Sequence, residues 1–249
     1  MPPYRLVWFQ HLHKAAGTYV IRRAMANGEQ FYENHENGNP CGEGGVIPLW
    51  EMNSNELTKF VDQCEDKGVT FVATEWGAPD FSVLAQDSRI HLITCIRDPI
   101  KRFISNFNYD YYWMWSDSKS YNQYISENNL HSSPEYYTRM FSRNADLSKS
   151  LTQTDFETAK KNITLFDTVI IAETGMSTLE ELGWIEESDT KHPTFGNISL
   201  ALSLLRKLRF FRLFKYLLQK KHIPPLEMNI ENINKYDIQL YNTLSIKKF

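Results

Sequence analysis

Two patterns of apolar and polar residues follow each other along the chain: continuous apolar runs and helical spacing. Continuous apolar runs, typical of strands buried in a parallel sheet, begin at Arg5 and occupy residues 69–76, 89–97 and 166–173. Helical spacing occupies 18–25, 54–66, a segment from Pro99 towards Trp115, 154–162, 200–221 and 230–244, and a short helix follows Ser177. Ser54 is expected to cap the helix over 54–66, and Thr154 with Glu157 is expected to form a capping box at the start of the helix over 154–162. Strands that alternate with helices predict one α/β domain over residues 1–249. Its central parallel β-sheet is flanked by helices, and the chain is mostly helical from about residue 199.

Three segments do not fit this alternation clearly. Residues 28–48 are rich in Gly, Asn and Pro and are predicted to form a loop over one face of the domain. Residues 108–145 are dense in Tyr and Trp, which suits either a surface that stacks on a flat or sugar-like ligand or aromatic packing on the core, the latter favoured for any single ring. The basic run 206–215 suits contact with an anionic sugar polymer or a membrane surface, but a helix covering the core is the preferred interpretation.

Composition narrows the class of protein. The 249 residues, 42% of them hydrophobic, are enough for one large core, and a net charge of −3 argues against nucleic acid as a partner. Three cysteines and seven histidines show no metal-ligand spacing, so we expect reduced thiols and no metal. The sequence contains no apolar run of 18 residues, so no integral membrane segment is expected. If Met1 is the natural start, we expect a cytoplasmic protein. The oligomeric state is left open.

The first candidate for chemistry is the turn after the first strand. There Lys14 is followed by Ala15, Ala16 and Gly17, and a helix begins near Thr18. A strand that feeds a helix through such a turn presents unpaired backbone N–H groups, and the helix dipole and the lysine add positive potential. The small side chains leave room for a ligand near the backbone. This pattern predicts a phosphate or sulfate site, although an ordinary strand–turn–helix corner explains it equally well when taken alone.

A second cationic residue at the end of a strand strengthens the prediction of a phosphate site. Arg97 ends the third apolar strand, and Ser105 follows eight residues later in the next helix. An arginine can bind a phosphate through two N–H groups, and the serine hydroxyl can reach the same group. Because ligands of open α/β sheets bind at the carboxyl ends of the strands, both sites are expected at one edge. Two phosphate sites there suggest a nucleotide with phosphates at both ends of its ribose.

These residues carry a resemblance to the sulfotransferases that use 3′-phosphoadenosine 5′-phosphosulfate (PAPS). The first motif is His11-Leu-His-Lys-Ala-Ala-Gly-Thr18, which resembles their 5′-phosphosulfate loop. The second is Cys95-Ile-Arg-Asp-Pro-Ile-Lys-Arg-Phe-Ile-Ser105, which resembles their 3′-phosphate motif. The similarity is greatest to the carbohydrate branch related to heparan sulfate 2-O-sulfotransferases, and weaker likenesses at 166–182 and 234–241 extend it over roughly residues 4–243. The loop departs from the branch pattern Pro-Lys-Thr-Gly-Gly-Thr at His13, Ala15 and Ala16, so a hydroxyl contact from position 15 is lost.

The resemblance implies a sulfotransferase fold, with a P-loop-like sheet, and in-line transfer of a sulfuryl group from PAPS to an acceptor hydroxyl. It implies that Lys14 stabilises the leaving phosphate of 3′-phosphoadenosine 5′-phosphate (PAP), that Glu75 is the general base, and that no metal is required. His11 is a further candidate, for lining the acceptor site or orienting Lys14. The implied nucleotide-binding residues are Lys14, Ala15, Ala16, Gly17, Thr18, Tyr19, Arg97, Ser105, Asn197 and Ser199. The acceptor is expected to be a carbohydrate or a hydroxylated small metabolite.

Two other readings stay open. One is a P-loop kinase or another NTP-dependent enzyme, which the sequence disfavours because it lacks the G-x-x-x-x-G-K-[ST] motif and Lys14 precedes its glycine. The other is a non-catalytic protein that binds a nucleotide or glycan on the same fold. A binder would not require both Lys14 and Glu75, and this distinguishes it from the enzyme.

Overall fold

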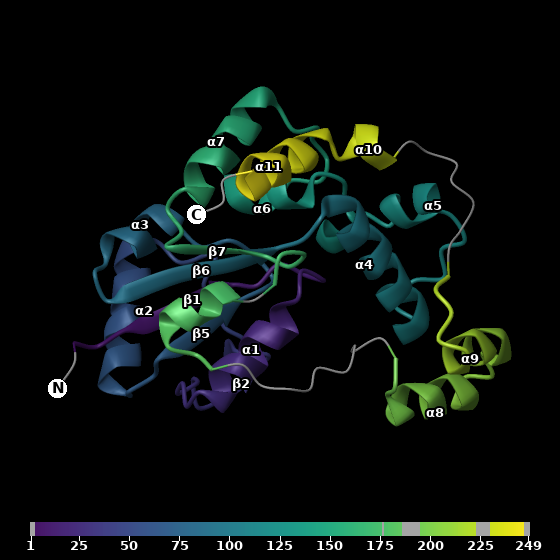
Figure 1. Cartoon of the computed structure of the whole chain (residues 1–249), viewed down its shortest axis with the longest axis horizontal. Helices are drawn as coiled ribbons and strands as arrows, with labels where there is room; N and C mark the ends of the chain where they lie inside the picture. The colour runs from purple at the N-terminus through teal and green to yellow at the C-terminus, as the bar shows by residue number, and fades with distance from the viewer. Residues whose placement is uncertain (1–2, 176, 186–194, 223–229, 247–249) are drawn as a thin grey trace.

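The computed structural model describes residues 3–175, 177–185, 195–222 and 230–246. Four parallel strands, β1 (Leu6–Gln10), β5 (Phe71–Thr74), β6 (Ile90–Ile96) and β7 (Thr168–Ile171), form the main sheet in the order β5-β1-β6-β7 (Figure 1). In the register, Phe9 of β1 pairs with Ala73 on one side and with Ile93 on the other. This confirms the predicted α/β class, a central parallel sheet and all four predicted strands.

Helices cover both faces of the sheet. Consecutive residues of a strand point to opposite faces, so each strand contributes to both layers. Leu6 and Trp8 of β1 pack in a cluster with residues of α2 (Ser54–Asp66), α3 (Phe81–Gln86), α6 (Tyr136–Ser142), α7 (Gln153–Ile163) and α11 (Lys235–Ile246). Val7 and Phe9 pack on the other face against α1 (Gly17–Ala26) and the 3₁₀ helix η2 (Ser177–Leu182). Every residue of β1 is buried, which explains the uninterrupted apolar run in the sequence.

The remaining helices extend from the sheet on the side of α4 (Pro99–Trp113). They are α5 (Tyr121–Ile125), the 3₁₀ helix η1 (Leu130–Ser132), α8 (Ile198–Arg206), α9 (Phe210–Leu217) and α10 (Ile230–Ile233). In Figure 1, α8 and α9 lie beyond α4 at the lower right, away from the sheet. No helix in the described ranges is long and apolar enough to cross a membrane.

Local corrections to the sequence prediction concern caps and breaks. The predicted loop at 28–48 contains a small antiparallel sheet of β2 (His35–Glu36), β3 (Asn39–Gly42) and β4 (Gly45–Val46). Asn53, not Ser54, caps α2, and Thr152 with Asp155, not Thr154 with Glu157, forms the capping box of α7. Each true cap lies just before the predicted one, where its side chain reaches the first free N–H groups.

The predicted helix over 200–221 is two helices. Leu208 lies between α8 and α9 with φ 53°, a left-handed conformation that interrupts the helical backbone. The predicted last helix is likewise divided, with Asn234 between α10 and α11. The preferred interpretation of the basic run, a helix covering the core, is confirmed for one side of the hairpin of α8 and α9, and the other side exposes large apolar side chains.

The aromatic stretch is mainly core. Among the rings of 108–145, those of Tyr111, Tyr112, Tyr121, Tyr124, Tyr136 and Tyr137 are buried. They join α4, α5 and α6 and hold the outer helices to the sheet. Tyr109 and Trp113 are exceptions, since both line the cleft described next.

Candidate active site

A cleft of ≈ 740 Å³ lies where β1, β5 and β6 end, at the carboxyl edge of the sheet. The loop after β1, the residue after β5 and the residue after β6 all contribute to it. It is lined by His11, His13, Lys14, Ala16, Gly17, Thr18, Arg22, Asn37, Glu75, Arg97, Ser105, Tyr109, Trp113, Phe195, Gly196, Asn197, Ile198 and Ser199. The two cationic strand ends that the sequence analysis singled out therefore meet in one cleft.

The loop between β1 and α1 has an unusual backbone. Lys14 and Ala16 have φ values of 63° and 69°, left-handed conformations that are uncommon without glycine. Ala16 precedes α1 and gives it no side-chain cap, although the first N–H groups of a helix need partners. Left-handed residues of this kind recur at functional loops, where the fold holds strain in place. Ala16, Gly17 and Thr18 at the start of α1 thus line the cleft.

Lys14 places a cationic side chain in the cleft beside this loop. Its Nζ lies 4.2 Å from the centroid of the Tyr109 ring, a cation–π contact with α4. Burial lowers the pKa of Lys14 to about 8, an effect that Arg97 reinforces and that the carboxylates of Asp110 and Glu75 oppose. An anion bound beside Lys14 would reverse this shift, because an adjacent negative charge favours the ammonium form.

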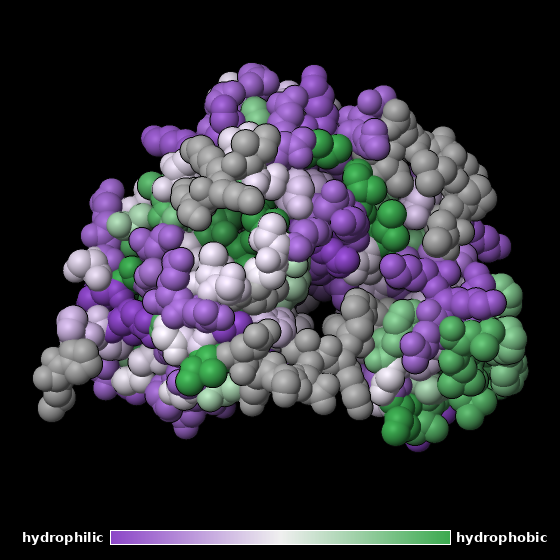
Figure 2. Space-filling view, viewed as in Figure 1, coloured by the Kyte–Doolittle hydropathy of each residue, from purple (hydrophilic) through white to green (hydrophobic). Residues whose placement is uncertain are grey.

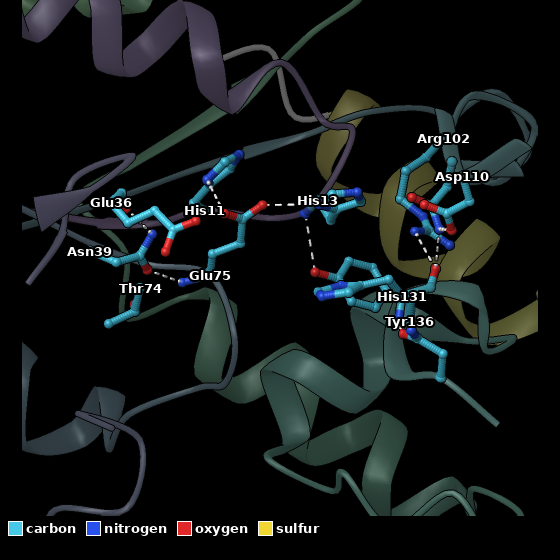
Figure 3. Close-up of polar contacts among 12 residues, drawn as sticks. His11, His13, Glu36, Asn39, Thr74, Glu75, Arg102, Asp110, His131 and Tyr136 are labelled. Atoms are coloured by element: carbon cyan, nitrogen blue, oxygen red, sulfur yellow. Dashed lines mark hydrogen bonds and ion pairs between the residues drawn. The ribbon is translucent and has the colours of Figure 1, made fainter. Parts of the chain in front are cut away.

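Glu75, directly after β5, is buried between two histidines (Figure 3). Its Oε1 lies 2.9 Å from His13 Nδ1, and its Oε2 lies 3.4 Å from His11 Nδ1. The backbone N–H of Glu75 donates to Asn39 Oδ1 at 2.8 Å, so β3 fixes the peptide. Burial alone would raise the pKa of Glu75, but His11 and His13 outweigh it and hold the pKa well below its usual range. Glu75 is therefore a firmly ionised carboxylate.

His13, one of the two histidines beside Glu75, lines the cleft. Its ring lies 4.6 Å from the ring of His131, centroid to centroid, and its backbone N–H donates to the Tyr136 hydroxyl at 3.1 Å. Burial lowers the pKa of His13, and the hydrogen bond to Glu75 opposes that shift. With Nδ1 engaged by Glu75, Nε2 is the nitrogen left to exchange a proton with a ligand.

His11 is held by packing on two sides. Its ring stacks on Phe9 with centroids 5.4 Å apart and planes at 17°. On the other side it lies against Gly17, where an added Cβ would come within 1.9 Å of His11 Cδ2. Position 17 must therefore be a glycine, because the His11 ring occupies the space that a Cβ would need. This contact ties the loop to the Glu75 cluster.

Arg97, directly after β6, faces both the cleft and an adjoining cavity of ≈ 250 Å³. Ser105 lines the same two spaces, and Lys101 and Lys221 line the second one. The backbone N–H of Arg97 donates to the Tyr137 hydroxyl at 3.1 Å, and its Nε lies 3.8 Å from Glu173 Oε1. The guanidinium is thus partly restrained and partly exposed.

Arg102, a second arginine near Arg97 in the sequence, does not line the cleft. It is buried, donates to the carbonyl of His131 at 3.0 Å and lies 4.4 Å from the centroid of the Tyr136 ring. It joins α4 to η1 and α6, and so it is a structural residue.

Most of the predicted site residues line the cleft. They are Lys14, Glu75, His11, Ala16, Gly17, Thr18, Arg97, Ser105, Asn197 and Ser199. Ala15 is buried in the core cluster beneath the loop, and Tyr19 lies on α1 with its hydroxyl 3.3 Å from Arg23 Nη1, so neither of them lines the cleft. Lys191 and His192, which precede Asn197 in the sequence, lie outside the described residues.

The residues of the cleft that sequence reasoning did not assign to it are His13, Arg22, Asn37, Tyr109, Trp113, Phe195, Gly196 and Ile198. Tyr109 and Trp113 belong to the aromatic stretch considered for ligand stacking, and His13 and Arg22 also carried a local signal. His13 interrupts the resemblance beside Lys14, and Arg22 lies one helical turn after Thr18. The others are brought to the cleft by β2, α4 and the approach to α8.

Comparison with models of protein families gave no match to this chain, and comparison with curated protein sequences gave none either.

Proposed function

We propose that the protein is a PAPS-dependent sulfotransferase that transfers a sulfuryl group to the hydroxyl of an acceptor. The observation that carries this proposal is the meeting of the Lys14 loop, the Arg97–Ser105 pair and the Glu75–His13 pair in one cleft. A donor with phosphate groups at the 5′ and 3′ positions requires two separate cationic sites. Transfer to a hydroxyl requires a third group that takes a proton.

The donor fits the cleft by charge. The 5′-phosphosulfate would lie at the loop of Lys14, Ala16, Gly17 and Thr18, where backbone N–H groups and the ammonium meet. The 3′-phosphate would lie between Arg97 and Ser105, and Asn197 and Ser199 at the start of α8 would flank the nucleotide. The backbone of this loop is already left-handed at Lys14 and Ala16, so the loop needs no rearrangement to receive the anion.

The chemistry is an in-line substitution at sulfur. The acceptor oxygen forms a bond to sulfur while the bond from sulfur to the 5′-phosphate oxygen breaks, and the electron pair of that bond leaves with PAP. Lys14 stabilises the negative charge that develops on the leaving oxygen. The acceptor proton must go to a base of the protein, and the resulting sulfate ester leaves with PAP.

For the base, the geometry favours His13 supported by Glu75. The sequence-based hypothesis gave this role to Glu75 itself, and that hypothesis stays a prediction. Because base strength follows the pKa, a carboxylate whose pKa is held low accepts a proton poorly. His13 can take the proton at Nε2, while Glu75 holds Nδ1 and stabilises the imidazolium that forms.

The acceptor is proposed to be a carbohydrate or a hydroxylated small metabolite. Tyr109 and Trp113 line the cleft, and their ring centroids lie 5.8 Å apart. Flat aromatic faces of this kind suit the apolar side of a sugar ring or of a hydrophobic alcohol.

Thermal unfolding in the presence of nucleotides tests the donor site. PAP should raise the unfolding temperature in proportion to the logarithm of its concentration, whereas ATP and NAD should have a much smaller effect. Transfer of labelled sulfate from PAPS to a panel of sugars and alcohols then tests the activity. Stabilisation by PAP without transfer to any acceptor would favour the non-catalytic binder, and stabilisation by ATP alone would overturn the proposal.

A further inference from the structure

The hairpin of α8 and α9 has two apolar faces. Leu200, Leu204 and Tyr216 are buried and pack with Tyr111 and Tyr112 of α4. The opposite face exposes nine large apolar side chains, and their exposed fractions run from 47% to 78%. These nine are Ile198, Leu202, Leu205, Leu208, Phe210, Phe211, Phe214, Leu217 and Leu218. A helix that only covers the core needs the first face and not the second.

The exposed side chains form one continuous patch. In α8 they recur at positions 198, 202 and 205, and in α9 at 210, 211, 214, 217 and 218, the spacing of a single helical face. Figure 2 shows the patch as the broad green area at the lower right, over the place of α8 and α9 in Figure 1. Contiguous exposed apolar surface of this extent marks an interaction site.

The charged residues of the hairpin itself are all cationic. Residues 198–221 contain no Asp or Glu, whereas the whole chain has a net charge of −3. The segment carries seven cationic residues, Arg206, Lys207, Arg209, Arg212, Lys215, Lys220 and Lys221. Arg209 and Arg212 pair with Asp117, and Arg206, Lys207, Lys220 and Lys221 are exposed beside the apolar side chains.

We infer that this hairpin binds the surface of a lipid bilayer that carries anionic headgroups. Apolar side chains flanked by Lys and Arg are the pattern of helices that lie in the plane of the membrane interface. Neither α8 nor α9 approaches the about 20 residues that a membrane-spanning helix requires. A second copy of the chain fits this surface less well, because a two-fold contact would bring the same cations against each other.

The inference is independent of the sulfuryl-transfer proposal, although the two sites adjoin. Ile198 is one of the exposed apolar residues and also lines the cleft with Asn197 and Ser199. A hairpin bound to a membrane would therefore hold the cleft beside the headgroups.

Flotation with vesicles tests the inference. The full chain should float with vesicles of phosphatidylcholine and phosphatidylglycerol, should bind vesicles of phosphatidylcholine alone more weakly, and should lose binding as salt is raised. The double variant Phe211→Ser with Phe214→Ser should abolish flotation. The matched control is Met25→Ser with Ile185→Ser, which removes two exposed apolar side chains outside the hairpin and should float like the parent chain.

A second pair of variants isolates the charges. Arg206→Gln with Lys207→Gln should weaken binding to the anionic vesicles about thirtyfold, since each basic residue near such a surface contributes about fivefold. The control Lys59→Gln with Lys161→Gln removes two exposed cations from α2 and α7 and should leave binding unchanged. Circular dichroism and unfolding temperatures equal to those of the parent show that the variants fold.

Three outcomes would overturn the inference. The first is an absence of flotation with either vesicle at low salt. The second is flotation that the hairpin variants leave unchanged. The third is a concentration-dependent dimer in sedimentation equilibrium that Phe211→Ser with Phe214→Ser converts to monomer while flotation persists, which would assign the patch to self-association.

Discussion

His13 Nδ1 and Glu75 Oε1 lie 2.9 Å apart, although 62 residues separate them in the chain. The loop after β1 brings one residue and the end of β5 brings the other, and these two strands are neighbours in the sheet. The contact makes the carboxylate and the imidazole a single unit, because each changes the proton affinity of the other.

The first prediction separates the two members of this pair. His13→Gln should lower turnover by about 10²–10⁴ while the affinity for PAP changes little, because the proton acceptor is lost and the phosphate sites remain. Glu75→Gln should lower turnover less if Glu75 only positions His13, and its pH–rate profile should keep the limb that reports the histidine. A complete loss of turnover in Glu75→Gln, together with an active His13→Gln enzyme, would return the role of base to Glu75.

The second prediction concerns the protonation of Lys14. The pKa of Lys14 is lowered to about 8 in the free protein, so an incoming anion should raise it and draw protons from solution near pH 8. Calorimetric titration with PAP in buffers of different ionisation enthalpy should show proton uptake between about pH 8 and 9. Lys14→Ala should abolish that uptake and lower turnover by about 10²–10³. Uptake that persists in the variant would show that another group titrates.

The third prediction assigns Arg97 to the 3′-phosphate. Arg97→Ala should weaken PAP binding by about ten- to a hundredfold, the value of a charged hydrogen-bond pair, and should leave the binding of adenosine 5′-monophosphate nearly unchanged. Arg143→Ala, which removes a partly exposed arginine paired with Asp80, is the control. An equal loss for both nucleotides would place Arg97 at the 5′ end or in the structural framework.

The fourth prediction tests the contact between the loop and the cluster. Gly17→Ala places a Cβ 1.9 Å from the His11 ring, so the ring or the start of α1 must move. We expect a loss of PAP affinity and of turnover, together with a lower unfolding temperature. Gly44→Ala is the matched control, since its Cβ meets nothing within 4 Å. A Gly17→Ala protein with unchanged PAP binding would show that the loop tolerates displacement of His11.

The fifth prediction is a pH dependence of stability. Glu135 accepts hydrogen bonds from the N–H groups of Tyr236 and Asp237, and Asp237 accepts them from Tyr137 and Thr138, so α6 and α11 cap each other. Burial, with the nearby Asp237 carboxylate, raises the pKa of Glu135 to about 7. The folded state then holds a proton that the unfolded state loses above about pH 4.5.

This carboxyl pair should therefore lower the free energy of unfolding as pH rises from about 4.5 to 7. Urea unfolding at several pH values measures the change. Glu135→Gln should flatten the profile over this window, and Glu157→Gln, an exposed glutamate on α7, should not. A profile that Glu135→Gln leaves unchanged would show that other groups set the dependence.

The sequence by itself determined the sheet and its two cationic ends. Buried parallel strands are apolar throughout, so β1, β5, β6 and β7 were visible as apolar runs, and the carboxyl-edge rule placed Lys14 and Arg97 together. Glu75 was added by the resemblance and not by this rule. The caps of α2 and α7 were misplaced by one or two residues, because several polar residues before each helix can serve and only the backbone path selects one.

Only the tertiary structure decided which distant residues touch. Nothing in the local pattern pairs His13 with Glu75, since the pairing of β1 with β5 brings them together. Nor does the local pattern send Tyr109 of α4 to the cleft while Tyr111 enters the core. The apolar period of residues 200–221 likewise predicts a helix but cannot say which face is covered. Burial depends on neighbours that the fold supplies, and here it left one face of α8 and α9 exposed.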